Sequence, residues 1–107
     1  MNIQELISRY RAGQRDFRNL NLIAIDLKNL NLSGANLSGA NLSGANLTRT
    51  NLSYANLTGT NLTKAKLKET NLTKANLCNA NLSDVDLSQA NLSQSYMRGA
   101  SLSGATW

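Results

Sequence analysis

The chain has 107 residues, with 11 Lys or Arg against six Asp or Glu, a formal net charge of +5 and no histidine. This length is typical of one domain. The lack of histidine removes the commonest general base and metal ligand, and a single cysteine, Cys78, cannot form an internal disulfide. No apolar run reaches the roughly 18 residues of a membrane-spanning helix, and the N-terminus lacks the apolar core of a secretory signal. We therefore expect one cytoplasmic domain without a membrane span.

Residues 2–12 predict a short amphipathic α-helix. Its apolar residues share one face at the spacing i, i+3, i+4, i+7: Ile3, Leu6, Ile7 and Tyr10. Asn2 is a good N-cap residue, and Gly13 is suited to ending the helix. A helix this short is marginal by itself. We therefore expect residues 1–14 to form a cap that packs on whatever follows.

A five-residue period begins after this helix and runs to the end of the chain. Taking the large apolar residue as the centre of each repeat, positions 17 to 102 give 18 centres, of which 16 are Leu. Asn or Asp precedes the centre in 15 repeats, the exceptions being Lys66, Tyr96 and Ser101. The centres form the expected core: Phe17, Leu22, Leu27, Leu32, Leu37, Leu42, Leu47, Leu52, Leu57, Leu62, Leu67, Leu72, Leu77, Leu82, Leu87, Leu92, Met97 and Leu102.

A period of five fits neither a helix nor a long strand. In an α-helix five residues advance about 500°, so the Leu side chains would spread around the axis, and a strand needs a period of two. If the chain bends once per repeat, the centre and the residue two before it point inward, while the Asn between them points outward. Successive bends wind a coil that stacks on the next at about 4.8 Å and buries the Leu.

The motif A-(N/D)-L-x-x, as in residues 35–39 (Ala-Asn-Leu-Ser-Gly), resembles the pentapeptide-repeat family. This resemblance implies an all-β fold, a right-handed quadrilateral parallel β-helix with four repeats per coil. Residues 15–107 would then make about 4.5 coils, behind the short N-terminal capping α-helix. Four repeats per coil would also stack Asn21, Asn41, Asn61 and Asn81 in one column. We expect these side chains to hydrogen-bond along the stack, and we therefore interpret the abundant Asn as structural and not as a binding surface.

The two ends of the array depart from the pattern. Near the start, Leu20, Ile25 and Leu30 occupy inner positions where Ala follows later, which suits a coil covered by a helix. At the other end, Trp107 stands where the next centre would be, and we expect it to close the column. Two columns could also meet there in a weak end-to-end dimer, the alternative being a monomer. The residues near that contact would be Tyr96, Met97, Leu102 and Trp107.

We find no constellation that predicts catalysis, metal binding or a cofactor. Asp84 and Asp86 form the only close acidic pair, and both point outward, whereas a tuned acid/base pair needs an enclosed site. The basic residues form two groups, which we interpret as solvated surface: Arg9, Arg11, Arg15 and Arg18, then Lys64, Lys66, Lys68 and Lys74. Only two aromatic residues, Tyr54 and Tyr96, point outward among them, which disfavours nucleic-acid binding by base stacking.

The sequence therefore predicts a non-catalytic structural or protein-interaction module with an unknown protein partner and no small-molecule substrate. Two alternatives remain open. Some members of the family act as DNA mimics on a type II topoisomerase in quinolone resistance, a role that depends on an acidic surface, and the charge of +5 disfavours it. The other alternative is weak nucleic-acid binding through the basic groups.

Overall fold

The computed structural model describes residues 1–107 and contains one helix, α1 (Ile3–Arg11). The helix begins where the backbone N–H of Glu5 donates to Asn2 Oδ1 at 2.9 Å. It ends in a Schellman motif, in which Gly13 N–H donates to Tyr10 O and Gln14 N–H donates to Arg9 O, each at 3.0 Å. Gly13 has φ of +100°, which glycine adopts without steric cost. No helix in the structure has the length and apolar character needed to cross a membrane.

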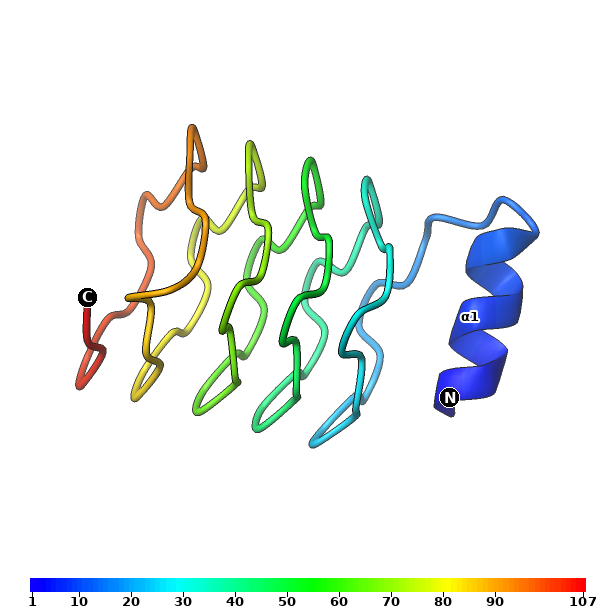
Figure 1. Ribbon diagram of the computed structural model, residues 1–107, viewed down its shortest axis with the longest axis horizontal. Coiled ribbons are helices and arrows are strands. Elements are labelled where there is room, and N and C mark those ends of the chain that lie inside the picture. The colour runs from blue at the N-terminus through cyan, green and yellow to red at the C-terminus, as the bar shows by residue number, and fades with distance from the viewer.

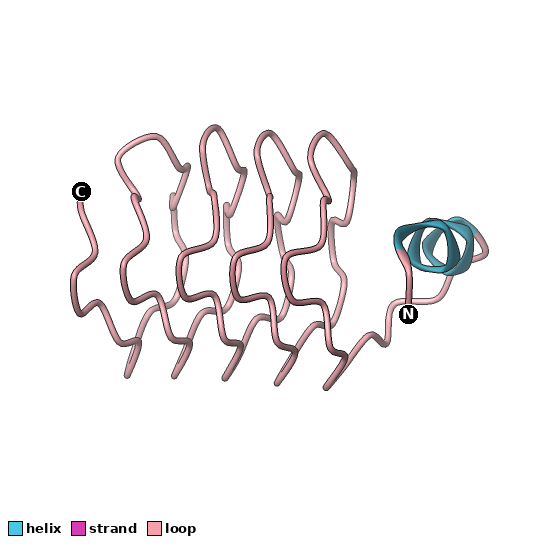
Figure 2. Cartoon of the chain, turned by 90° about the horizontal axis from the view of Figure 1, so that it is seen from below, coloured by secondary structure: helices cyan, strands magenta, loops and turns pink.

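The remaining chain winds into a right-handed, four-sided parallel β-helix (Figures 1 and 2). Each repeat contributes one bridge residue, and each bridge joins residues 20 apart, as between Asn36 and Asn56. Four five-residue repeats therefore make one coil. Neighbouring coils are joined by backbone bonds such as Leu37 N–H to Asn56 O, at 2.8 Å. Because each side holds a single bridge residue between two corners, no extended strand forms.

Every corner after the first, which runs from Phe17 to Leu20, is a tight turn closed by a backbone hydrogen bond. Ala35 N–H, for example, donates to Leu32 O at 3.1 Å across Ser33 and Gly34. The residue two after each centre has positive φ, as the type II turn requires. Six glycines and 11 other residues adopt this conformation, and Gln89 is the one such position that does not.

The abundant Asn residues stabilise these turns locally. In all 15 repeats with Asn or Asp before the centre, its side-chain oxygen accepts the backbone N–H two residues later, as when Ser38 N–H donates to Asn36 Oδ1 at 3.1 Å. This is the Asx turn, and Asn and Asp are the residues that form it. The expectation that stacked Asn side chains bond to one another along a column is therefore wrong. The side-chain oxygen is satisfied within its own repeat.

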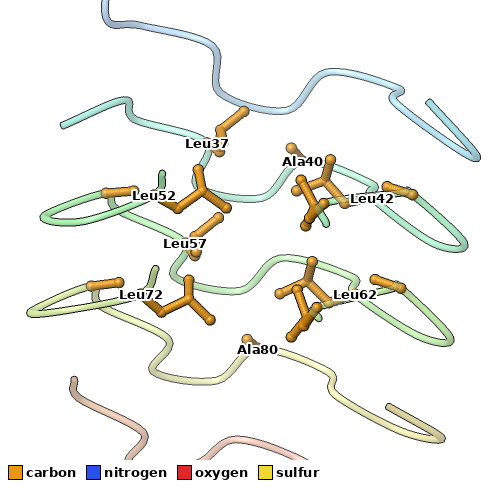
Figure 3. Close-up of a cluster of buried hydrophobic side chains, with 14 of the residues drawn as sticks. Leu37, Ala40, Leu42, Leu52, Leu57, Leu62, Leu72 and Ala80 are labelled. Carbon is orange, nitrogen blue, oxygen red and sulfur yellow. The ribbon is translucent and has the colours of Figure 1, made fainter. Parts of the chain in front are cut away.

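The column is filled by Leu from all four sides (Figure 3). The centres from Phe17 to Leu87 are buried, with at most 3% of each exposed. Burial of each Leu contributes about 1.5–3 kcal/mol. Three inward threonines donate their hydroxyl protons to backbone carbonyls: Thr50 to Leu27 at 2.7 Å, Thr60 to Leu57 at 2.8 Å and Thr70 to Leu47 at 2.7 Å. The core therefore has no unsatisfied side-chain polar atom.

Helix α1 lies against the N-terminal end of the column (Figure 1). Leu6 is fully buried in the core cluster, and Ile3 and Tyr10 are half-buried against it. The hydroxyl of Tyr10 donates to Ser33 O, and Gln14 Nε2 donates to Asp16 O, both at 2.7 Å. The helix and the residues just after it therefore cover apolar side chains of the first coil and satisfy two carbonyls on its free edge.

The C-terminal end has no such cover. Leu92, Met97 and Leu102 are only half-buried, and Trp107 is 68% exposed. The expectation that Trp107 closes the column is therefore wrong. An indole that is mostly exposed does not fill the end of the column.

Candidate functional site

The outward charges are distributed unevenly over the four sides. We define side 3 as the stack formed by residues 26–29, 46–49, 66–69 and 86–89, which the 20-residue register places above one another. Of the 13 charged residues in the repeats after Arg15, seven lie on side 3: Asp26, Lys28, Arg49, Lys66, Lys68, Glu69 and Asp86. The other three sides share the remaining six. Side 3 is therefore the distinctive face of an otherwise Asn-, Ser- and Thr-rich surface.

The second basic group predicted from the sequence is divided by the fold. Lys66 and Lys68 lie on side 3, whereas Lys64 and Lys74 stand at corners of the neighbouring sides. Lys74 lies near the ring of Tyr54, with its Nζ 5.4 Å from the ring centre. The group thus does not form one continuous basic patch.

The first basic group is largely engaged with its neighbours. Arg15 stacks on the Tyr10 ring at 3.7 Å, which ties the end of the helix to the first repeat. Arg18 pairs with Asp16 at 2.9 Å, and this hydrogen bond lowers the pKa of Asp16 and raises the pKa of Arg18. Arg9 reaches Glu5 one helical turn away, at 3.9 Å.

On side 3 itself, the charges of the first two coils are paired and those further along are not. Lys28 approaches Asp26 at 3.6 Å, and Arg49 approaches Glu69 of the next coil at 3.9 Å. No ion pair involves Lys66, Lys68, Asp84 or Asp86. Three charged groups of side 3 and Asp84, at a corner of the neighbouring side, are therefore free to contact another molecule.

The backbone ladder is interrupted among these same residues. On side 3, bridges join Asp26 to Asn46, Asn46 to Lys66 and Asp86 to Thr106. No bridge joins Lys66 to Asp86. Two ladder bonds are missing, those from Leu67 N–H to Asp86 O and from Asp86 N–H to Ala65 O. In Figure 1 the yellow-orange stretch of the chain here leaves the even spacing of the other coils and bends toward the C-terminal end.

Two local departures from the repeat explain the interruption. Lys66 replaces Asn, so Lys68 N–H has no side-chain acceptor in the turn. Gln89 lacks the positive φ of its equivalents, and as a result Glu69 N–H donates to Gln89 O at 2.9 Å instead of to Ser88 O. The turn that contains Gln89 is therefore reoriented, and the coil that carries Lys66 separates on side 3 from the coil that carries Asp86.

A cleft of ≈ 390 Å³ opens at this point. Its walls come from adjacent coils, with Lys66 and Lys68 on one and Asp84 and Asp86 on the other, and its complete lining is Thr48, Ala65, Lys66, Leu67, Lys68, Asp84, Asp86 and Gln89. Hydrogen bonds from Ser88, and a further one from Thr106, lower the pKa of Asp86. The cleft thus combines two cations, two anions and free backbone groups, which suits binding better than catalysis because it is open.

A second cleft, of ≈ 360 Å³, lies between α1 and the first coil. It is more apolar, and Ile7, Leu30 and Leu32 contribute to its walls. Leu30 belongs with Leu20 and Ile25, the inner residues of the first coil, and all three stay half-buried beside the helix. One nine-residue helix thus covers the end of the column only in part.

The residues predicted to form a C-terminal contact do not gather in one place. Tyr96 is 62% exposed on its side of the column, while Met97 and Leu102 face the open end and Trp107 projects from the last residue. Cys78 is a half-buried free thiol whose backbone N–H donates to Asn76 Oδ1 at 3.0 Å. No group of three His, Cys, Asp or Glu residues is placed to hold a metal ion.

The sequence did not predict that Lys66, Lys68, Asp84 and Asp86 share one cleft, nor that Gln89 contributes to it. The signal that was available is Lys66, the first of three departures from Asn or Asp before a centre. Gln89 carried no comparable signal, since Glu69 and Gln94 adopt positive φ at equivalent positions.

Comparison with known proteins agrees with this architecture. The family model of pentapeptide repeats matches eight copies over residues 16–53, 45–84, 55–94 and 80–106. The chain belongs to the pentapeptide-repeat family. No curated protein matches the sequence.

Solved structures of other pentapeptide-repeat proteins share the fold. One from the thylakoid lumen of Arabidopsis thaliana is 24% identical with a TM-score of 0.81, over 89% of this chain and 67% of that one. Rfr23 from the cyanobacterium Cyanothece 51142 is 27% identical with a TM-score of 0.59, over 98% of this chain and 99% of that one. QnrB1, a plasmid-mediated fluoroquinolone resistance protein, is 23% identical with a TM-score of 0.40, over 85% of this chain and 54% of that one.

Proposed function

We propose that this pentapeptide-repeat protein is a non-catalytic interaction module that binds a protein partner through side 3. The observation that carries the proposal is the concentration of seven of the 13 charged repeat residues on that one side. The ladder holds the outward residues on a rigid frame, so a partner meets a preformed pattern of charges. Complementary charges of this kind determine specificity and association rate more than affinity.

The test is affinity capture from the native cells with the chain as bait. In one variant Lys28, Lys66 and Lys68 are changed to Glu, and in the matched control Lys64, Lys74 and Arg98 are changed to Glu. Both variants alter the net charge equally, but only the first reverses charges on side 3. We expect the first variant to lose the captured protein and the control to retain it. Equal capture by both variants contradicts side 3 as the binding face.

The distribution of acidic residues argues against DNA mimicry. Four of the six acidic residues have a basic partner within 4.0 Å, which leaves Asp84 and Asp86 as the only unpaired ones. A mimic of duplex DNA must present continuous negative potential. We therefore expect no inhibition of DNA gyrase, and dose-dependent loss of supercoiling at micromolar protein would contradict this.

Weak nucleic-acid binding through the basic residues is tested by titrating the chain with duplex DNA at several salt concentrations. We expect no binding that falls steeply with salt, because the cations do not form one patch. Location in the cytoplasm stays a prediction, which fractionation of the native cells would test.

A further inference from the structure

The cleft between the third and fourth coils has features that a protein-docking face does not need. Its two walls carry opposite charges, Lys66 and Lys68 against Asp84 and Asp86, and none of the four is in an ion pair. The interrupted ladder also leaves Leu67 N–H without an acceptor and Ala65 O without a donor. Complementary hydrogen-bonding and charged groups thus line a single opening.

The volume of the opening limits what it can hold. At ≈ 390 Å³ it lies at the lower end of the range of about 300–1,000 Å³ for small-molecule pockets. Opposite charges on the two walls disfavour a simple anion or cation, since each would meet like charges across the cleft. A molecule with a negative and a positive group at opposite ends meets a favourable charge on each wall.

The separation of the walls selects among such molecules. Neighbouring coils stack about 4.8 Å apart, and here the bridge between Lys66 and Asp86 that would hold them at that spacing is missing. Two residues of extended peptide span about 7 Å, whereas the charged groups of one amino acid are closer together. We propose that the cleft binds a short zwitterion of dipeptide length. Its carboxylate lies against Lys66, Lys68 and the Leu67 N–H, and its ammonium group lies against Asp84 and Asp86.

The test is an NMR titration of the full chain, with amide shifts followed residue by residue. The probe is glycylglycine, compared with N-acetylglycine, which lacks the ammonium group, and glycinamide, which lacks the carboxylate. We expect glycylglycine to cause saturable shifts at Leu67, Lys68 and Glu69. Each half-charged compound should bind at least tenfold more weakly. Absence of a saturable shift, or equal binding of N-acetylglycine, overturns the proposal.

Two variants locate the site. Lys66→Asn with Gln89→Gly restores the repeat at both departures, so we expect the missing rung to form, the Leu67 amide to exchange more slowly with solvent and glycylglycine binding to be lost. Asp84→Asn with Asp86→Asn keeps the Asx turn but removes the anionic wall. This variant should bind glycylglycine about as weakly as N-acetylglycine.

The control replaces lysines outside the cleft, Lys64→Asn with Lys74→Asn, and should bind glycylglycine as the wild type does. Wild-type affinity in both cleft variants overturns the assignment. Loss of affinity in the control overturns it as well. The titration uses no protein partner, so its outcome is independent of the capture experiment on side 3.

Discussion

At the N-terminal end of the column, α1 lies over the first coil and buries Leu6 completely. Tyr10 of the helix donates to Ser33 O, and Gln14, just after the helix, donates to Asp16 O. At the C-terminal end, no element lies over the last coil, and the backbone N–H groups of Leu92 and Met97 have no acceptor in the chain. Both ends belong to the same column and carry an unpaired β-edge, although the repeats depart from the regular sequence at each end. The difference teaches that the repeats supply the column while a non-repeating segment decides whether its end is closed.

Removing residues 1–13 should have the largest effect on solubility and stability, because it leaves the N-terminal end of the column as exposed as the C-terminal end. Leu20, Ile25 and Leu30 would lose the helix that half-buries them, and the free edge of the first coil would be exposed for pairing with other chains. We expect aggregation or loss of solubility, measured by light scattering and size-exclusion chromatography. A soluble monomer with an unchanged denaturation midpoint would show that α1 is not a functional cap.

Truncation of a core Leu should cost far more in the middle of the column than at the open end. Leu57 is fully buried, so Leu57→Ala should lower the free energy of unfolding by about 2–5 kcal/mol. Leu102 is half-buried, so Leu102→Ala removes less apolar area from the core and should cost less than about 2 kcal/mol. Urea denaturation of both variants measures the difference. Equal costs would mean that the last coil is covered in solution.

A smaller effect on stability is expected from removing or adding the Asn that precedes a centre, which can be tested at two stacked positions of one column. Asn76→Ala removes the acceptor of Cys78 N–H and should cost about 0.5–1.5 kcal/mol. Tyr96, which follows in the same column, lacks such an acceptor, so Tyr96→Asn should stabilise the last coil by a similar amount. Denaturation midpoints shifted in the same direction by both changes would contradict the Asx-turn role.

These contrasts also show what the sequence could predict. The unbroken period identified the column, and the resemblance to the family supplied its four sides and its hand. The role of Asn was predicted as structural, but its bond was assigned to the wrong partner, because periodicity indicates that a residue points outward and not which neighbour it contacts. The local Asx turn satisfies the side chain without help from the next coil.

The cleft could not be predicted from the repeat because it depends on two departures 23 residues apart. Lys66 removes one turn acceptor, and Gln89 adopts a different φ in the next coil. Only stacking at 20 residues per coil brings their repeats together on side 3. The position of Trp107 was also mispredicted: its place in the five-residue register favoured an inward side chain, whereas the indole is 68% exposed.

The smallest expected effect concerns contact between two open ends. Tyr96 and Trp107 are 62% and 68% exposed there, and Met97 and Leu102 are half-buried, so an end-to-end contact would remove apolar area from water. The end face is small: the two shorter dimensions of the molecule are 25 and 22 Å, which limits it to about 550 Å². A stable interface buries about 800 Å² on each partner.

We therefore expect a monomer at low concentration and weak self-association at high concentration. Sedimentation velocity over a hundredfold range of concentration measures this, with Trp107→Ala compared with the wild type. The exposed indole is the largest apolar group at that end, so its removal should shift the association to higher concentration. Tyr54→Ala is the control, because Tyr54 is equally exposed at 62% but lies in the second coil, away from the end. A wild type that stays monomeric throughout contradicts the end-to-end contact. An equal effect of both substitutions contradicts it as well, because a contact at the open end involves Trp107 and not Tyr54.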